Sequence, residues 1–282
     1  MFLINDSKDT LGYKLSNKKL AGRVDLIRAR YEINLVPADD LPMSENRPLL
    51  RITKNQLRIE HQKCNLFFHP SMALLRMITI KRGITDRFLR AAGLAEGDTF
   101  LDATMGLASD SLIASWAVGK TGKIISIEGS SIIHLLVSEG LNSLEQLKPV
   151  RVSSQEKEEA WQELAEASSR VQTICADHLA VLKQLPDASV DIIYFDPMFR
   201  DTFADSSSIK PLKDLSIPEP LGIETIKEAC RVARRRIVLK ERNNSGEFAR
   251  LGFKVINGGK YSSISFGIID LAKTGGHTDC SL

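Results

Sequence analysis

The sequence predicts an α/β fold built on a parallel sheet, with a small α+β module in front of it. From about residue 98 onward, short apolar runs alternate with stretches of helical periodicity. This alternation is typical of strands wrapped by helices on both faces of a parallel sheet. Segments 123–127 and 190–195 are rich in Val and Ile throughout, which indicates strands buried on both faces.

Seven strands are expected in the larger part of the chain. They lie at 99–103, 123–128, 171–177, 190–197, 236–240, 253–256 and 264–270. The fourth strand ends at its own proline, Pro197, which cannot donate to a sheet ladder. An N-G-G cluster separates the last two strands and predicts a closing antiparallel pair. We therefore expect a mostly parallel sheet whose last strand is antiparallel.

Helical periodicity marks the segments between these strands. Helices are expected at 71–80 and 86–92 ahead of the sheet, and then at 109–118, 132–147, 156–167, 179–185 and 223–232. The helix at 109–118 stops at Gly119, a residue suited to the position after a helix end. The helix at 156–167 is strongly acidic and is interpreted as a solvated surface helix.

The front of the chain is basic and is expected to form a module at 1–65, ahead of a domain at 66–282. A helix is predicted at 14–29 and strands at 31–36, 49–53 and 57–60. Residues 1–95 carry 17 Lys and Arg against 9 Asp and Glu, whereas residues 96–282 carry 21 against 26. A front with charge +8 on a body with charge −5 favours a polyanionic partner, and a solvated basic surface is the alternative.

Composition excludes several classes of protein. No apolar run approaches the ~18–20 residues that span a bilayer, and the first residues lack the apolar core of a secretory signal, so a cytoplasmic protein is expected. The four cysteines show no C-x-x-C spacing and the histidines no paired spacing, so no metal site is expected.

Acidic residues end four successive strands of the predicted sheet, namely Asp102, Glu128, Asp177 and Asp196. Parallel strands bind ligands at their carboxyl ends. Glu128 is placed to accept hydrogen bonds from ribose hydroxyls and Asp177 from an adenine amine. The turn after the first strand has a single glycine, Gly106, and an acid at the helix start, Asp110. This turn disfavours a pyrophosphate, and therefore a dehydrogenase, and favours a cationic adenosine ligand such as S-adenosylmethionine.

The blocks D-A-T-M-G-L-A-S-D-S (102–111) and Y-F-D-P-M-F (194–199) resemble class I S-adenosylmethionine-dependent methyltransferases, and more narrowly the ribosomal RNA methyltransferase J family. The resemblance spans roughly residues 50–270 and implies a Rossmann-like seven-stranded methyltransferase sheet. It also implies S-adenosylmethionine as cofactor, with ribosomal RNA or a small-subunit precursor as partner and the exocyclic amine of a guanine as target. The family's cofactor contacts fall on Ser109, Asp110, Glu128, Gly129, Asp177, His178 and Asp196. Contacts are also expected at Asp102, which ends the first strand, and at Gly106 in the turn that follows it.

The D-P-M-F block is expected to carry the catalysis. The Asp196 carboxylate and the Pro197 carbonyl are in the right order to accept the two N–H bonds of an aryl amine and so to orient its lone pair. Phe199 is expected to stack on the base, with core packing as the alternative. Arg200 and Lys240 are expected to contact the substrate.

Two basic clusters are candidates for RNA phosphates. One lies around the fifth strand and comprises Arg231, Arg234, Arg235, Arg236, Lys240 and Arg242, for most of which a solvated helix end is the alternative. The other lies in the front module and comprises Lys18, Lys19, Arg23, Arg28 and Arg30.

Other functions remain open on the residues alone. A methyltransferase acting on DNA, a protein or a small molecule is one alternative, and the basic front argues only against the small molecule. A non-catalytic protein that binds an adenosine ligand or RNA is another, and the intact D-P-M-F block weighs against it. The oligomeric state is left open.

Overall fold

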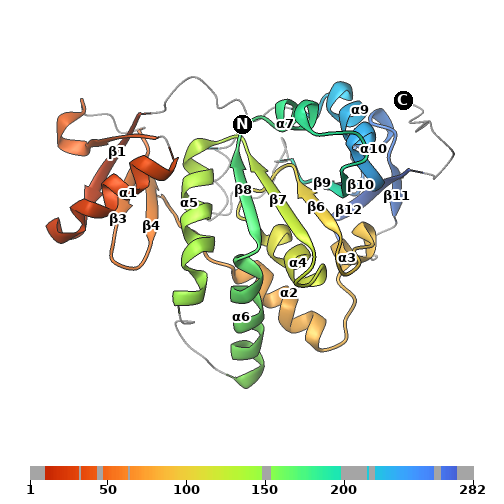
Figure 1. Cartoon of the computed structure of the whole chain (residues 1–282), viewed down its shortest axis with the longest axis horizontal. Coiled ribbons are helices and arrows are strands. Elements are labelled where there is room, and N and C mark those ends of the chain that lie inside the picture. Colours follow the sequence, from red (N-terminus) through yellow and green to blue (C-terminus); the bar gives the residue numbers. More distant parts are fainter. Residues whose placement is uncertain are drawn as a thin grey trace.

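Two sheets lie side by side in the computed structural model (Figure 1). The structure describes residues 10–31, 33–42, 47–62, 64–147, 154–197, 215, 220–256 and 262–271. Thr10–Leu66 supplies a five-stranded sheet, and the rest of the chain supplies a seven-stranded sheet. Among the described helices, none is long and apolar enough to cross a membrane.

The seven-stranded sheet confirms the predicted fold class. Its strands are β6 (Thr99–Asp102), β7 (Lys123–Glu128), β8 (Val171–Cys175), β9 (Val190–Phe195), β10 (Ala233–Arg242), β11 (Lys254–Ile256) and β12 (Ile264–Asp270). They follow the order β11-β12-β10-β9-β6-β7-β8. Strand β12 is antiparallel to both β10 and β11, whereas the pairs from β10 through β8 are parallel. β10 extends beyond the expected 236–240 because Ala233 pairs with β9 at its start and Glu241 and Arg242 pair with β12 at its end.

Helices cover both faces of this sheet. One face carries α2 (Ser71–Lys81), α3 (Arg87–Ala92), α4 (Ser109–Ala117), α5 (Ser131–Ser143) and α6 (Gln155–Ser168), and the other carries α7 (His178–Gln184), α9 (Ile223–Val232) and α10 (Glu247–Arg250). Neighbouring strand residues alternate between the two cores because side chains of a strand point to opposite faces. Tyr194 packs under α3 and α4, whereas Phe195 packs on the other side, and both are fully buried.

The acidic helix α6 is only partly the solvated helix that its sequence predicts. Trp161 and Leu164 are buried in the core shared with α2 and α4. The acidic residues face the basic end of α2, where Glu156 pairs with Arg82 at 2.7 Å. Tertiary packing therefore buries one side of α6 and neutralises much of the other.

The front module is built on β1 (Thr10–Leu15), β2 (Asn34–Pro37), β3 (Leu49–Ile52), β4 (Leu57–His61) and β5 (Cys64–Leu66), in the order β2-β1-β3-β4-β5. It also holds η1 (Lys18–Leu20), η2 (Ala38–Asp40) and α1 (Ala21–Tyr31). The helix predicted at 14–29 is wrong at its start, because Lys14 and Leu15 pair with β3. Asn17 then caps η1 by accepting from the Lys19 amide at 2.9 Å. The strands at 49–53 and 57–60 are confirmed, whereas β1 and β5 were not predicted.

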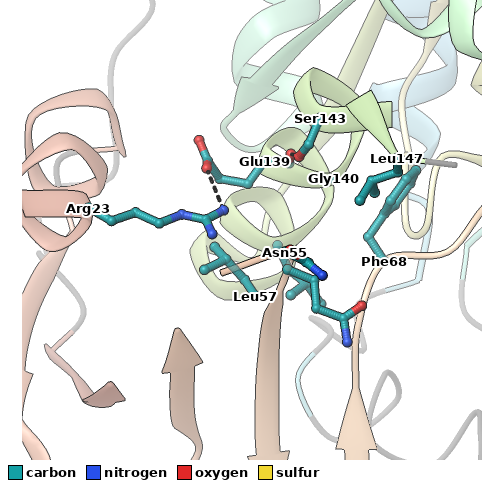
Figure 2. Close-up of a pocket in the computed structure, with 10 residues that line it drawn as sticks. Arg23, Asn55, Leu57, Phe68, Glu139, Gly140, Ser143 and Leu147 are labelled. Atoms are coloured by element: carbon teal, nitrogen blue, oxygen red, sulfur yellow. Dashed lines mark hydrogen bonds and ion pairs between the residues drawn. The ribbon is translucent and has the colours of Figure 1, made fainter. Parts of the chain in front are cut away.

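Helix α5 is shared by both cores. Its residues Leu135 and Leu136 pack into the front module, whereas Ile133 and Val137 pack under the larger sheet. An ion pair crosses the same junction, where Arg23 of α1 reaches Glu139 of α5 at 3.6 Å (Figure 2). The front module is therefore fixed to the helix that follows the second strand of the larger sheet.

Candidate active site

The strand register brings the predicted acidic residues to one edge of the sheet. Asp102 ends β6 opposite Tyr194 of β9 and Ser126 of β7. On the other side of β9, Phe195 pairs with Leu239 of β10, so that Asp196 and Lys240 follow at the same level. The carboxyl ends of β6, β7, β9 and β10 thus converge, as expected for a ligand site in a parallel sheet.

The turn after β6 contains two residues with positive φ, and the sequence pattern indicated only the first, Gly106. Gly106 has φ 50°, and Ala108, just before α4, has φ 57°. Both angles fall in the left-handed region, which glycine adopts freely and alanine rarely. The Met105 amide donates to the Ile127 carbonyl at 2.8 Å, which ties this turn to β7.

Glu128 holds the turn from the neighbouring strand. Its carboxylate accepts from the Gly106 amide at 3.0 Å and from the Ser130 amide at 2.9 Å. Burial raises the pKa of Glu128, although the backbone amides of Ser130, Gly106 and Gly129 act in the opposite direction. The structure thus places Gly106, Glu128 and Gly129 together at the end of β7.

Asp102 lies underneath this turn. Only 1% of it is exposed. It accepts from the Ser111 hydroxyl at 2.5 Å and from the Thr104 amide at 3.1 Å, and Ser126 donates in turn to Ser111. Burial raises the pKa of Asp102 to about 7. Asp102 thus holds the turn at both ends, through the Thr104 amide after β6 and the Ser111 hydroxyl in α4.

A line of charged side chains of alternating sign crosses the site, and we call it the charge chain: Asp86, Arg76, Asp110, Lys240 and Asp196. Arg76 of α2 donates to both carboxylate oxygens of Asp86, at 2.8 and 3.0 Å, and to Asp110 of α4 at 2.5 Å. Lys240 of β10 donates to Asp110 at 3.3 Å and to Asp196 at 2.7 Å. The chain therefore links the first helix of the domain to the end of β9.

The pKa values of the two site carboxylates of the charge chain, Asp110 and Asp196, are shifted in opposite directions. Burial raises the pKa of Asp110, but the charges of Lys240 and Arg76 outweigh it and the pKa is lowered. The Tyr194 hydroxyl also donates to Asp110, at 2.7 Å. For Asp196, burial outweighs Lys240 and raises the pKa to about 6. Asp110 is consequently a firmly ionised acid, whereas Asp196 lies close to its protonation point.

The remaining predicted site residues are spread along the same edge. Ser109 is the first residue of α4. Asp177 is exposed and caps α7 by accepting from the Ala180 amide at 2.8 Å. The His178 ring packs edge-on against Phe195, with ring centroids 6.0 Å apart. Pro197 directly follows Asp196, whereas Phe199 and Arg200 lie outside the described residues.

Four of the six residues of the basic cluster around β10 lie away from the site. Arg231, Arg234, Arg235 and Arg236 lie at the opposite, amino end of β10, and four residues of strand, about 13 Å, separate Arg236 from Lys240. Each of these arginines pairs with an acid of the fold, Arg235 with Asp98 and Arg236 with Asp270, both at 2.5 Å. The others pair with Asp187, Glu228 and Asp191. These arginines hold strand starts and helix ends together, so the expectation that they lie beside the site is wrong.

Three arginines of the front module are also bound within the fold. Arg23 donates to the Thr53 carbonyl at 2.7 Å, and Arg30 pairs with Glu139 at the same distance. Arg28 donates to the Leu35 carbonyl. Lys18 and Lys19 are exposed, and so are Arg28 and Arg30, but Arg28 is paired with Asp25 and Arg30 with Glu139. The module's outward basic surface is therefore smaller than the sequence count indicated.

Sequence reasoning missed three residues that shape the site. Thr104 accepts from the Asp196 amide at 2.6 Å, Tyr194 binds Asp110, and Arg76 binds both Asp110 and Asp86. A signal existed for Arg76, since it is the one charged residue in the otherwise uncharged stretch 71–80. A cation within an apolar helix requires a buried partner.

The donor set of this edge fits S-adenosylmethionine. Carboxylates line the strand ends, and the first turn offers one glycine in place of the several that a pyrophosphate requires. Within the described part of the chain, His, Cys, Asp and Glu side chains do not group as a metal site would require. The site is therefore suited to a cationic adenosine ligand.

Comparison with known proteins identifies the class. Residues 41–250 match the family model described as "Putative SAM-dependent methyltransferase". The match covers well over half of the chain, so the protein belongs to this family, and S-adenosylmethionine is its cofactor. A solved SAM-dependent methyltransferase from Neisseria gonorrhoeae shares the fold, with a TM-score of 0.59 and 16% identity over 92% of this chain and 95% of that chain.

Two relatives are informative. The uncharacterized protein YpiP of Bacillus subtilis is 40% identical over 237 residues, which is 84% of this chain and 87% of YpiP. The ribosomal RNA small subunit methyltransferase J of Acinetobacter baumannii is 28% identical over 174 residues. That match spans 56% of each chain, little more than half the length of the methyltransferase.

Proposed function

We propose that this methyltransferase acts in the cytoplasm on RNA, at the exocyclic amine of a guanine in ribosomal RNA. The observation that carries the proposal is Asp196 followed by Pro197 at the end of β9, with Asp196 held by Lys240 at 2.7 Å. The similarity to the ribosomal RNA small subunit methyltransferase J of Acinetobacter baumannii supports the choice of substrate. In this proposal residues 1–65 form a module that docks RNA.

The geometry indicates which residues would hold the cofactor and which would bind the amine. When bound, S-adenosylmethionine supplies an electrophilic methyl group. Glu128, Asp177 and the turn at Gly106 are the groups that would hold its adenosine part. In the described part of the chain, Lys240 bonds one carboxylate oxygen of Asp196 and no hydrogen bond reaches the other. That second oxygen is the acceptor that we assign to an amine N–H, with the Pro197 carbonyl as the second acceptor.

Asp196 also suits the proton balance of the reaction. An amine that gains a methyl group must lose a proton. A carboxylate with a pKa of about 6 is ionised at neutral pH and is a stronger base than an ordinary aspartate. Asp196 is therefore placed to orient the amine first and to take its proton afterwards.

The test is nucleoside mass spectrometry of ribosomal RNA from a deletion strain and from strains complemented with wild type or Asp196→Ala. We expect N2-methylguanosine to fall in the deletion strain and to return only with wild type. In vitro, Asp196→Ala should lose about 10²–10³ in rate, as for other preorganised polar groups, and the exposed Asp187→Ala is the matched control. A deletion strain with unchanged ribosomal nucleosides would move the substrate away from ribosomal RNA.

A further inference from the structure

Lys240 is fully occupied by carboxylates. Its ammonium group bonds Asp196 at 2.7 Å and Asp110 at 3.3 Å, and only 25% of its side chain is exposed. Moving this lysine toward a phosphate would leave Asp196 without a counter-charge among the described residues and would leave Asp110 with Arg76 alone. Breaking a buried pair in this way is strongly unfavourable. The geometry therefore argues against Lys240 as a substrate contact.

Arg76, like Lys240, is shared between two carboxylates of the charge chain, here Asp86 and Asp110. Its planar guanidinium binds Asp86 with two donors and Asp110 with a third, and it lies over the Phe88 ring at 5.3 Å. Arg76 thus neutralises one side of Asp110 and leaves Lys240 free to be shared with Asp196. A lysine at position 76 would not reproduce this fork.

We propose that Lys240 and Arg76 are positioning residues, which keep Asp196 ionised and fixed at the end of β9 without touching RNA. Lys240 acts directly on Asp196, and Arg76 acts through Asp110. The proposal rests on the proposed function in one respect, namely that Asp196 binds the amine that receives the methyl group. The placement of the charges themselves does not depend on the substrate.

The surroundings of Asp196 give the direction of the expected pH effect. Among the residues that the structure describes, its charged or titratable neighbours are Lys240 and Glu241 on β10, Asp110 on α4, Asp102 on β6 and Tyr194 on β9. Lys240 is the one cation in this set. Removing it should therefore raise the pKa of Asp196 above its present value of about 6, and methyl transfer should require a higher pH.

The first experiment reads the ionisation of Asp196 without any RNA. Carboxyl ¹³C NMR titrations of wild type, Lys240→Met and Lys240→Arg are compared, with Asp196→Asn used to assign the signal. We expect Lys240→Met to raise the apparent pKa of Asp196 by roughly 1–2 pH units and Lys240→Arg to leave it near that of wild type. The exposed Lys120→Met is the control. An unshifted Asp196 in folded Lys240→Met would overturn the proposal.

The second experiment separates positioning from phosphate binding. For Lys240→Met we expect a lower kcat near neutral pH, an acid limb moved to higher pH, and an unchanged salt dependence of RNA affinity. A phosphate contact would instead reduce the salt slope by about one and raise KM, and this result would overturn the proposal. If wild type methylates no RNA, the proposed function fails, but the titration still decides the role of Lys240.

Arg76 is tested with Arg76→Met and Arg76→Lys. Both should show the same pH shift in a weaker form, because they act through Asp110. Thermal melting identifies variants that fail to fold, and a combined Arg76→Met, Lys240→Met variant measures the coupling between the two sites. Shifts that simply add, as for independent residues, would remove Arg76 from the proposal.

Discussion

A single buried carboxyl, Asp102, shows how the first turn of the site is held at the residue scale. Asp102 accepts from Ser111 and from the Thr104 amide, so the turn between β6 and α4 rests on it. The same burial raises its pKa to about 7. Asp102 therefore binds a proton more tightly in the folded protein than in the unfolded chain, where the pKa is about 3.9.

This difference predicts a pH-dependent contribution of Asp102 to stability. The contribution is full below about pH 4 and is lost as the pH rises through about 7. From about pH 5 to about pH 8, wild type should lose about 3 kcal/mol relative to Asp102→Asn, whose side chain does not titrate. Urea unfolding of both proteins at the two pH values measures this. A difference that does not change with pH would show that Asp102 is ionised throughout.

At the scale of elements, helix α5 is the part on which two cores depend. It packs Leu135 and Leu136 toward the front module and Val137 toward the larger sheet. Gly140, near its end, allows the Phe68 ring to approach the helix backbone. A Cβ atom at position 140 would lie 2.2 Å from that ring. The absence of a side chain here is a packing requirement.

Gly140→Ala should therefore destabilise the protein, by about 1–3 kcal/mol or more as in other overpacked cores. Gly22→Ala in α1 is the matched control, because no atom lies within 4 Å of its added Cβ. That change should stabilise by about 0.5–1 kcal/mol, since alanine favours helix over glycine. Chemical denaturation of the two variants gives both values. Equal effects would mean that Phe68 moves aside at little cost.

At the scale of the whole molecule, most arginines of the two basic clusters serve the fold. Arg23 and Arg30 reach Glu139 across the junction of the two sheets, and the arginines at the start of β10 pair with neighbouring acids. Surface counts of charge therefore overstate what RNA would meet. Of the predicted basic cluster of the front module, Lys18 and Lys19 on η1 are the exposed lysines.

We expect RNA docking to depend on these two lysines. Reversing both, with Lys18→Glu and Lys19→Glu, should weaken RNA affinity and reduce its salt slope by about two, because each phosphate contact releases counterions. Lys120→Glu with Lys123→Glu changes the net charge equally and is the control. Cofactor affinity should stay constant in both. Equal losses of RNA affinity would indicate net charge alone, and no loss would remove the front module from RNA binding.

The sequence by itself predicted the parallel sheet and the edge at which its acidic strand ends meet. Buried runs such as 190–195 indicate strands, and acids such as Glu128 and Asp196 end them, because a parallel sheet gathers its carboxyl ends at one edge. In the front module the sequence did less well. The basic stretch at 14–29 has helical composition, yet its first two residues join β1, since pairing with β3 outweighs local preference.

Only the tertiary structure decided which charges meet. Arg76 and Asp110 are 34 residues apart in the chain, and Lys240 is 130 residues beyond Asp110. Their contact depends on how α2 and α4 pack over β9 and β10, which no local pattern records. The arginines at the start of β10 were misplaced for the same reason. An ion pair is formed by the positions of two side chains in space, whereas periodicity fixes only the face on which each one lies.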